Sequence, residues 1–164
     1  PSKWASVWKN FDKLVKFSNT KAGKRIKVRV TTVNQIHNAL HIVDFWKYMH
    51  EYQCKNDKGI GMSTNQLVEP QYYSMAHSPQ WLRDKQEQQV LEFLEEIKNS
   101  PHFEDYEEPL MEMVNFGKDP DHAYNPAIMK QYVEVTNNYD IFRGHDVMSV
   151  APEFQRIKND TKAD

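Results

Sequence analysis

The chain has 164 residues, of which 39% are hydrophobic and 12% aromatic, and its formal net charge is −2 at pH 7. That length suits about one domain with a buried core, the composition excludes wholesale disorder, and no apolar run approaches the roughly 18 residues that span a bilayer. The single cysteine, Cys54, excludes an intrachain disulfide and any multi-cysteine cluster, so we expect a soluble, cytoplasmic protein with no membrane partner and no signal peptide.

Opposite charges are concentrated in the two parts of the sequence. Residues 1–58 contain 12 Lys and Arg against 4 Asp and Glu, a net +8, whereas residues 59–164 contain 9 against 19, a net −10. A basic segment of this kind can attract nucleic acid. Its lysines follow helix-surface spacing, at Lys9, Lys13 and Lys16, so we favour a solvated face complementary to the acidic part and do not expect a nucleic-acid partner.

The N-terminal third predicts a helix, a strand and a second helix. Apolar residues recur at helical spacing over residues 4–17, and residues 21–24 (KAGK) interrupt that pattern. Residues 25–33 (RIKVRVTTV) then alternate, with Ile and Val on one side and charged residues on the other, as in a strand. Asn34 suits the N-cap of a helix over residues 36–52, because its short side chain can accept a backbone N–H.

Residues 60–68 predict a second strand, which is weakened by glycine and amide residues and ended by Pro70. Ser78 and Pro79 suit the start of a long helix, with Ser as the N-cap and Pro in the first turn. Its apolar stripe continues to Ile97.

Helices are expected to fill the rest of the chain. One lies around residues 109–116 and another over residues 126–142. Arg143 and Gly144 suit the end of the second helix, because a cation is favourable near the last carbonyls and glycine adopts a left-handed backbone easily. We expect the tail from residue 159 to fray.

Strands separated by helices favour a parallel sheet with βαβ crossovers. Two strands alone make a poor sheet, because each leaves one edge without a partner. The pattern therefore predicts an α/β fold whose further strands lie upstream, in a partner chain or in segments that the pattern does not reveal. The lack of an initiator Met agrees with an upstream origin.

Three segments carry a succession of short motifs: residues 25–46 (RIKVRVTTVNQIHNALHIVDFW), 61–82 (GMSTNQLVEPQYYSMAHSPQWL) and 130–154 (KQYVEVTNNYDIFRGHDVMSVAPEF). Their order resembles the C-terminal half of radical S-adenosylmethionine proteins, in the branch with a twitch-type auxiliary-cluster domain. That branch closes with a Leu-Asp-x-x-Arg-Gly element and a Pro-Glu. Here the element begins with Tyr139 in place of Leu, and the Pro-Glu is Pro152-Glu153.

The resemblance implies an incomplete parallel β/α barrel with a helical C-terminal extension. Residues 1–124 would form the C-terminal part of a TIM-like barrel, and residues 125–164 a helix and tail packed on it. The family's C-x3-C-x2-C cluster motif, its auxiliary-cluster cysteines and its Gly-Gly-Glu segment are absent. The resemblance therefore implies a fragment that is inactive alone and lacks its N-terminal barrel half.

In the intact family, S-adenosylmethionine and a [4Fe-4S] cluster generate a 5'-deoxyadenosyl radical that abstracts hydrogen from a substrate, here a small molecule or peptide that the sequence does not identify. Ligands of parallel α/β folds gather at the carboxyl ends of the strands. The resemblance then implies that Thr32 and Asn34 contact the ribose or amino-acid end of the cofactor. Asn65, Gln66 and Val68 would contact its adenine or the substrate. A plain strand residue and a plain helix cap are the structural alternatives for the first two.

Other groups of residues give weaker evidence for a metal-binding, nucleophilic or stacking site. His37 and His41 have the spacing at which two imidazoles on one helix can share Zn²⁺, but a surface pair is favoured. Cys54 lies beside Lys55 and Lys58, which can lower a thiol pKa, although an incidental thiol is favoured. The acidic run Glu104–Glu108 is read as a solvated face, and Tyr72, Tyr73 and Trp81 as core or barrel-mouth aromatics instead of a stacking platform.

Two rival functions remain open. One is a small non-catalytic α/β interaction module whose exposed sheet edge recruits a partner. The other is a nucleic-acid binder that uses residues 1–58, for which salt-dependent retention on heparin or DNA is required.

Overall fold

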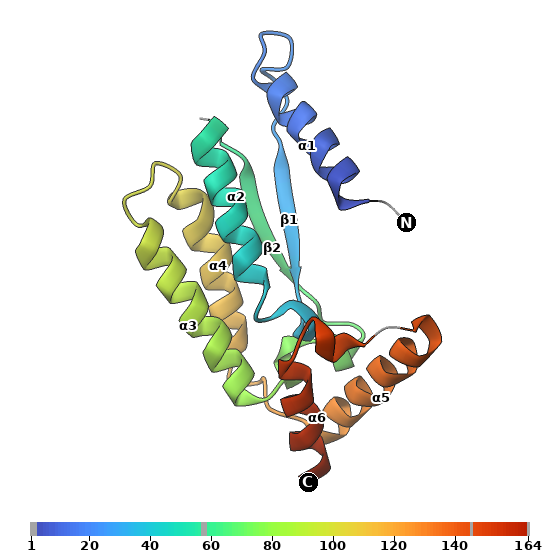
Figure 1. Cartoon of the computed structure of the whole chain (residues 1–164). Helices are drawn as coiled ribbons and strands as arrows, with labels where there is room; N and C mark the ends of the chain where they lie inside the picture. Colours follow the sequence, from blue (N-terminus) through green and yellow to red (C-terminus); the bar gives the residue numbers. More distant parts are fainter. Residues whose placement is uncertain (1–2, 57–58, 145, 164) are drawn as a thin grey trace.

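The computed structural model describes residues 3–56, 59–144 and 146–163 (Figure 1). In chain order the elements are α1 (Trp4–Ser18), β1 (Arg29–Asn34), η1 (Ile36–Asn38), α2 (Ile42–Asn56), β2 (Gly61–Gln66), η2 (Gln71–Tyr73), η3 (Met75–His77), α3 (Gln80–Ile97), α4 (Glu104–Gly117), α5 (Pro126–Arg143), η4 (Val147–Ser149) and α6 (Glu153–Ala163). None of the helices in these ranges combines the length and hydrophobicity needed to cross a membrane.

β1 and β2 form a two-stranded parallel sheet, joined by the crossover helix α2. Thr32 lies opposite Thr64 in the register, and Asn34 lies opposite Gln66. The predicted parallel βαβ unit is confirmed. Whether the sheet belongs to a barrel remains an expectation, because the described residues supply these two strands alone.

Both strands are shorter than the alternating patterns predict. β1 begins at Arg29 instead of residue 25, because its partner begins at Gly61 and the first ladder bond joins the Gly61 amide to the Val28 carbonyl at 3.0 Å. β2 ends at Gln66, two residues before the predicted end. The alternation of apolar and polar residues continues beyond the residues that pair with the neighbouring strand. The ends of each strand are therefore set by pairing.

The helix after β1 begins differently from the prediction. The N-cap of η1 is Gln35, whose backbone N–H bonds to the Asn38 side chain at 3.1 Å, and α2 proper begins at Ile42. Asn34 is the last residue of β1, and its side chain bonds to Gln66 instead of a helix start. The predicted cap at Asn34 is therefore wrong, because its side-chain amide donates to Gln66 on the neighbouring strand.

Three further helix boundaries differ. Pro79 is the N-cap of α3, whereas the Ser78 hydroxyl donates to the Met75 carbonyl at 2.8 Å. α4 begins at Glu104 and contains Pro109, so it starts earlier than predicted. The tail does not fray at residue 159: α6 continues to Ala163.

α5 ends as predicted. Asn125 caps its N-terminus by accepting from the backbone amides of Ala127 and Ile128, and Pro126 occupies the first turn. Gly144 follows Arg143 with φ of 63°, a left-handed backbone that glycine adopts without strain.

Two hydrophobic cores hold these elements together. The first lies between the strands and helices α1 to α4 and includes Val15, Val28, Trp46, Met62, Phe93, Tyr106 and Leu110. The second joins the residues after β1 to the C-terminal helices and includes Ile36, Leu82, Met129, Tyr132, Phe154 and Ile157. α5 and α6 therefore pack on the body of the protein.

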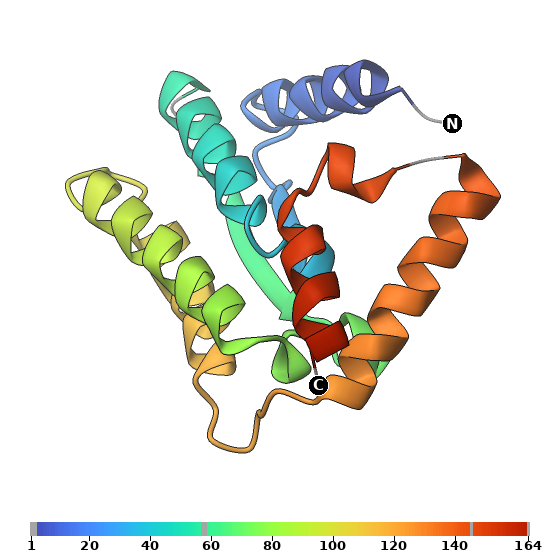
Figure 2. The ribbon, with the colours of Figure 1, turned by 60° about the horizontal axis from the view of Figure 1, so that its bottom comes forward.

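The sheet has one covered face and one bare face. Val28, Val30 and Met62 point into the first core, on the side where Figure 2 shows α2, α3 and α4. On the other face, Thr31 is exposed and Val33 is 41% exposed. This asymmetry determines which strand residues are available to a ligand.

Candidate functional site at the carboxyl end of the sheet

An amide cluster closes the carboxyl end of the sheet on its covered face. The Asn34 amide donates to Gln66 Oε1 at 2.9 Å and to Gln86 Oε1 at 3.3 Å. Gln86, from α3, donates in return to Asn34 Oδ1 at 2.9 Å and to the Ala39 carbonyl at 2.8 Å. Three elements are thus tied together by buried polar groups that satisfy one another.

The cluster leaves two buried polar atoms without a hydrogen-bond partner in the described part of the chain. They are Gln66 Nε2 and the neighbouring Thr64 hydroxyl, both on β2. A buried polar group without a partner costs free energy, so each marks a place where a ligand or water can bond.

The five predicted cofactor residues lie on different sides of the sheet. Asn34 and Gln66 are brought together in the amide cluster, and the Thr32 hydroxyl donates to the Ser63 carbonyl at 3.3 Å. Asn65 is exposed on the bare face, and Val68 is 58% exposed beyond the strand end. A common contact of all five with one ligand stays a prediction.

The bare face carries polar residues that the sequence analysis did not single out. Thr31 and Ser63 share a hydrogen bond of 2.9 Å between their hydroxyls, across β1 and β2. The alternation of residues along β1 already distinguishes its two faces. Thr32 and Asn34 lie on the same face as the apolar Val30, whereas Thr31 lies on the opposite face. Parity along the strand therefore indicates Thr31 as the more accessible hydroxyl.

A cleft of about 390 Å³ lies beside this strand end. It is lined by Gln35, His37, Tyr73, Thr136, Tyr139, Asp140, Arg143 and Val147. Gln35 follows directly on Asn34, so the end of β1 forms one wall and α5 another. The size suits a small polar molecule.

His37 occupies a half-buried position in this cleft. Its Nδ1 lies 3.1 Å from the Tyr132 hydroxyl, and its ring centroid lies 4.9 Å from that of Tyr73. Burial lowers the pKa of His37, and the charge of Asp140 opposes this shift. Burial also raises the pKa of Tyr132, so its hydroxyl keeps its proton and can donate to Nδ1. Nε2 of a neutral His37 would then carry the proton.

α5 supplies the other polar groups of the cleft. The Thr136 hydroxyl is buried and has no partner among the described residues. The Arg143 guanidinium lies 5.1 Å from the centroid of the Tyr139 ring, and Asp140 accepts from the Val147 amide at 2.9 Å. One cation, one carboxylate and an unpaired hydroxyl thus converge on a space next to the sheet.

The weaker residue sets do not converge. His37 bonds to Tyr132, whereas His41 lies 3.1 Å from Glu153, so the two imidazoles do not share a site. Within the described ranges no three side chains of His, Cys, Asp or Glu are grouped to hold a metal ion. Cys54 is exposed and lies 3.6 Å from His50 Nε2, while Lys58 falls outside the described residues.

The acidic run and the aromatics are partly structural. Tyr106, inside the run, is buried and donates to Gln53, so only the flanking carboxylates are solvated. Tyr72 and Tyr73 stack edge to face at 4.7 Å against the second core. Trp81 also packs there and donates to Asp160 at 2.8 Å, as expected of core aromatics.

Comparisons of the chain with protein-family models, with curated proteins and with solved structures found no match.

Proposed function

We propose that this chain is the C-terminal α/β part of a radical S-adenosylmethionine enzyme of the twitch-type branch. The order of the motifs in residues 25–46, 61–82 and 130–154 supports the family. The parent enzyme would cleave S-adenosylmethionine reductively and use the 5'-deoxyadenosyl radical to abstract hydrogen from a substrate. Residues 1–124 would be barrel and residues 125–164 its C-terminal extension.

The observation that carries the proposal is the two-sided character of the sheet. In a β/α barrel, helices cover the outer face of each strand, and the inner face points into the barrel. Here the face with Val30 and Met62 is covered by helices, whereas the face with Thr31 and Asn65 is bare and largely polar, with Val33 as its exposed apolar residue. In the part of the chain that the structure describes, the outer edge of each strand has no strand partner, so further strands are required to close such a wall.

The residues present do not fit an iron–sulfur cluster. A [4Fe-4S] cluster that leaves one iron open for S-adenosylmethionine needs three cysteine thiolates, and this chain has Cys54 alone. Cys54 also lies near the C-terminal end of α2, which leads into the start of β2, so it belongs to the end of the sheet opposite the cleft. The cluster would have to be supplied by residues outside this chain.

S-adenosylmethionine fits the chain only in part. The Asn34 side chain is committed to the amide cluster and Gln66 Nε2 is buried on the covered face, whereas Asn65 is exposed on the bare face. We propose that this chain contributes Asn65, on the bare face at the end of β2, and the adjoining cleft. The missing barrel half would contribute the remaining contacts.

The test uses the full-length gene product. After anaerobic reconstitution with iron and sulfide, we expect bound cluster and release of 5'-deoxyadenosine on reduction with S-adenosylmethionine present. An Asn65→Ala variant should weaken S-adenosylmethionine binding, whereas Asn115→Ala, an exposed site on α4, should not. Coding sequence without a C-x3-C-x2-C motif in roughly 200 upstream residues, about one domain, would contradict the proposal.

A non-catalytic α/β interaction module is the second candidate. Two hydrophobic cores within one chain favour it, since they predict a domain that is stable without further strands. If the chain is instead part of an enzyme, exposed apolar side chains such as Trp4, which is 60% exposed, should be covered by the missing strands. Strong binding of a hydrophobic dye to the isolated chain favours the enzyme part, and weak binding favours the module.

A further inference from the structure

A cationic segment covers α1 and the turn that follows it, and this turn lies at the amino end of β1, remote from the cleft. Over residues 3–29 there are nine Lys and Arg and one acidic residue, Asp12, and all nine cationic side chains are exposed. The net charge of this segment is therefore 9 − 1, or +8, although the whole chain carries −2. β1 separates this turn from the cleft by about 20 Å, six residues at the usual rise.

The cations of this segment are largely unpaired. Within the described residues, Lys16 alone forms an ion pair, to Asp12 at 2.7 Å. Other lysines of the chain do find carboxylates: Lys47 pairs with Glu96, and Lys118 with Glu87. The basic segment is thus not neutralised by the acidic part of the chain, which revises the interpretation as a complementary face.

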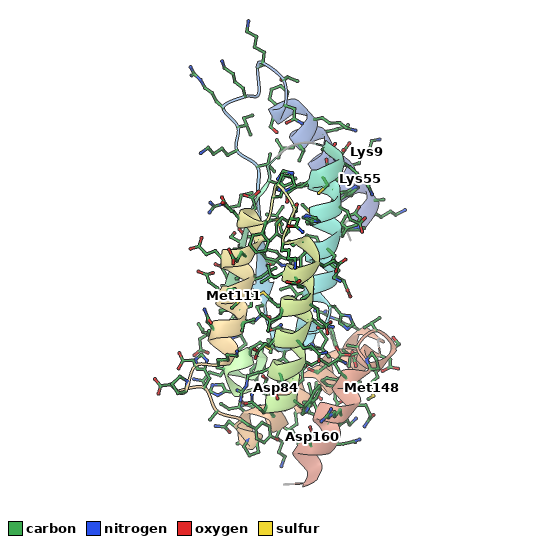
Figure 3. All side chains as sticks on the ribbon, turned by 90° about the vertical axis from the view of Figure 1, so that its left-hand side faces the viewer. Lys9, Lys55, Asp84, Met111, Met148 and Asp160 are labelled. Carbon is green, nitrogen blue, oxygen red and sulfur yellow. The ribbon has the colours of Figure 1, made fainter. Side chains whose placement is uncertain are left out.

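The turn between α1 and β1 concentrates this charge. It presents four cations, Lys21, Lys24, Arg25 and Lys27, and Arg29 follows as the first residue of β1; we call these five residues the cationic turn. Figure 3 shows nitrogen-tipped side chains projecting from this turn, at the end of the molecule away from α5 and α6. Unpaired, outward-directed cations at this density favour a polyanion.

The backbone of the turn is fixed by its own hydrogen bonds. The Thr20 hydroxyl donates to the Phe17 carbonyl at 2.8 Å and accepts from the Gly23 amide at 3.1 Å. A Cβ at Gly23 would lie 2.1 Å from the Phe17 carbonyl oxygen, so the chain closes more tightly there than any other residue allows. The cations are therefore presented on a preformed scaffold, which reduces the ordering cost of binding.

An exposed aromatic side chain accompanies the charge. Phe17, in the last turn of α1, is 47% exposed, and Ile26, within the turn that follows, is 38% exposed. Phosphates attract the cations, and an unpaired base can stack on the Phe17 ring. A lipid headgroup has no planar ring to stack on Phe17, and an acidic peptide carries one only where its sequence includes an aromatic residue. Single-stranded nucleic acid has a base on every nucleotide, so the combination favours it.

We propose that the cationic turn, with Phe17, binds single-stranded nucleic acid. The site is independent of the proposed catalytic role and would hold nucleic acid at the end of the sheet opposite the cleft. Five phosphate contacts predict a slope of about −3.5 for log affinity against log salt. Raising salt from about 50 to about 200 mM should then weaken binding roughly 100-fold.

Fluorescence anisotropy with a labelled oligothymidylate of about 20 nucleotides tests this site. The triple variant K21A/K24A/R25A should lose at least about tenfold in affinity, with a salt slope near −1.4. The matched control K85A/K98A/K130A removes the same charge from exposed positions outside the segment and should bind as wild type. The Phe17→Ala variant should lose about fivefold with the slope unchanged.

Circular dichroism of each variant shows whether it is folded, and only folded variants are compared. Absence of binding at low salt overturns the proposal, as does equal loss in the two triple variants. Preferential binding to phosphatidylserine vesicles or to an acidic peptide, with no binding to the oligonucleotide, also overturns it and assigns the turn to that partner instead.

Discussion

Replacing Gln86 with leucine should destabilise the protein more than any surface substitution on α3. Gln86 is 3% exposed and makes three hydrogen bonds, two with the Asn34 side chain and one with the Ala39 carbonyl. Leucine fills a similar volume, so the cavity contribution is small. The lost bonds and the stranded Asn34 amide should lower the free energy of unfolding by about 3 kcal/mol.

Urea unfolding followed by tryptophan fluorescence measures this effect. Gln88→Leu is the control, because Gln88 is exposed on the same helix and bonds only to Glu92 within the described residues. It should change the free energy of unfolding by less than about 0.5 kcal/mol. A cycle with Asn34→Ala should give a coupling of about 1.5 kcal/mol between Asn34 and Gln86. A loss of less than about 1 kcal/mol in the free energy of unfolding for Gln86→Leu would refute the claim that the Asn34–Gln86 hydrogen bonds stabilise the fold. The absence of coupling between the two positions would refute it as well.

Two further substitutions test the turn and the cleft. Gly23→Ala should lower the free energy of unfolding by about 1–3 kcal/mol, because its Cβ meets the Phe17 carbonyl, whereas Gly59→Ala, with open space around it, should be neutral in the same assay. Burial lowers the pKa of His37 in the folded state, so that as the pH falls the imidazole is protonated in the unfolded chain before it is protonated in the folded one. The free energy of unfolding should therefore fall as the pH drops below about 6.5. Urea midpoints at two pH values should differ less for His37→Gln than for wild type; an equal difference argues against this contribution.

The parts of the fold that sequence predicted rest on local signals. Apolar spacing over residues 4–17 indicates α1, and the alternation before Asn34 indicates β1. Pro126 and Gly144 mark the two ends of α5 through their own backbone preferences. Parallel pairing follows from the helix between the strands. Such a connection returns the chain to the end of the sheet where β1 began, so that β2 runs in the same direction.

The errors arise where a distant residue decides the outcome. The Asn34 cap fails because Gln86, 52 residues away in sequence, takes part of its hydrogen bonding. The fraying predicted after residue 159 fails because α6 is anchored by Phe154 and Ile157, buried in a core that α5 also builds. No local pattern contains that information.

The candidate site was predictable in position but not in composition. Strand ends and their polar residues are visible in sequence, which locates Asn34 and Gln66. The cleft also needs Thr136 and Arg143 from α5, and nothing in the sequence shows that this helix returns to the end of β1. Tertiary contacts alone bring those groups together.

The side chains of the bare face of the sheet are not needed to build the two hydrophobic cores. Thr31, Ser63 and Asn65 belong to neither hydrophobic core, so their side chains can change without opening a cavity or stranding a buried group. Substitutions at these three positions should therefore change the polarity of this face while the fold is retained.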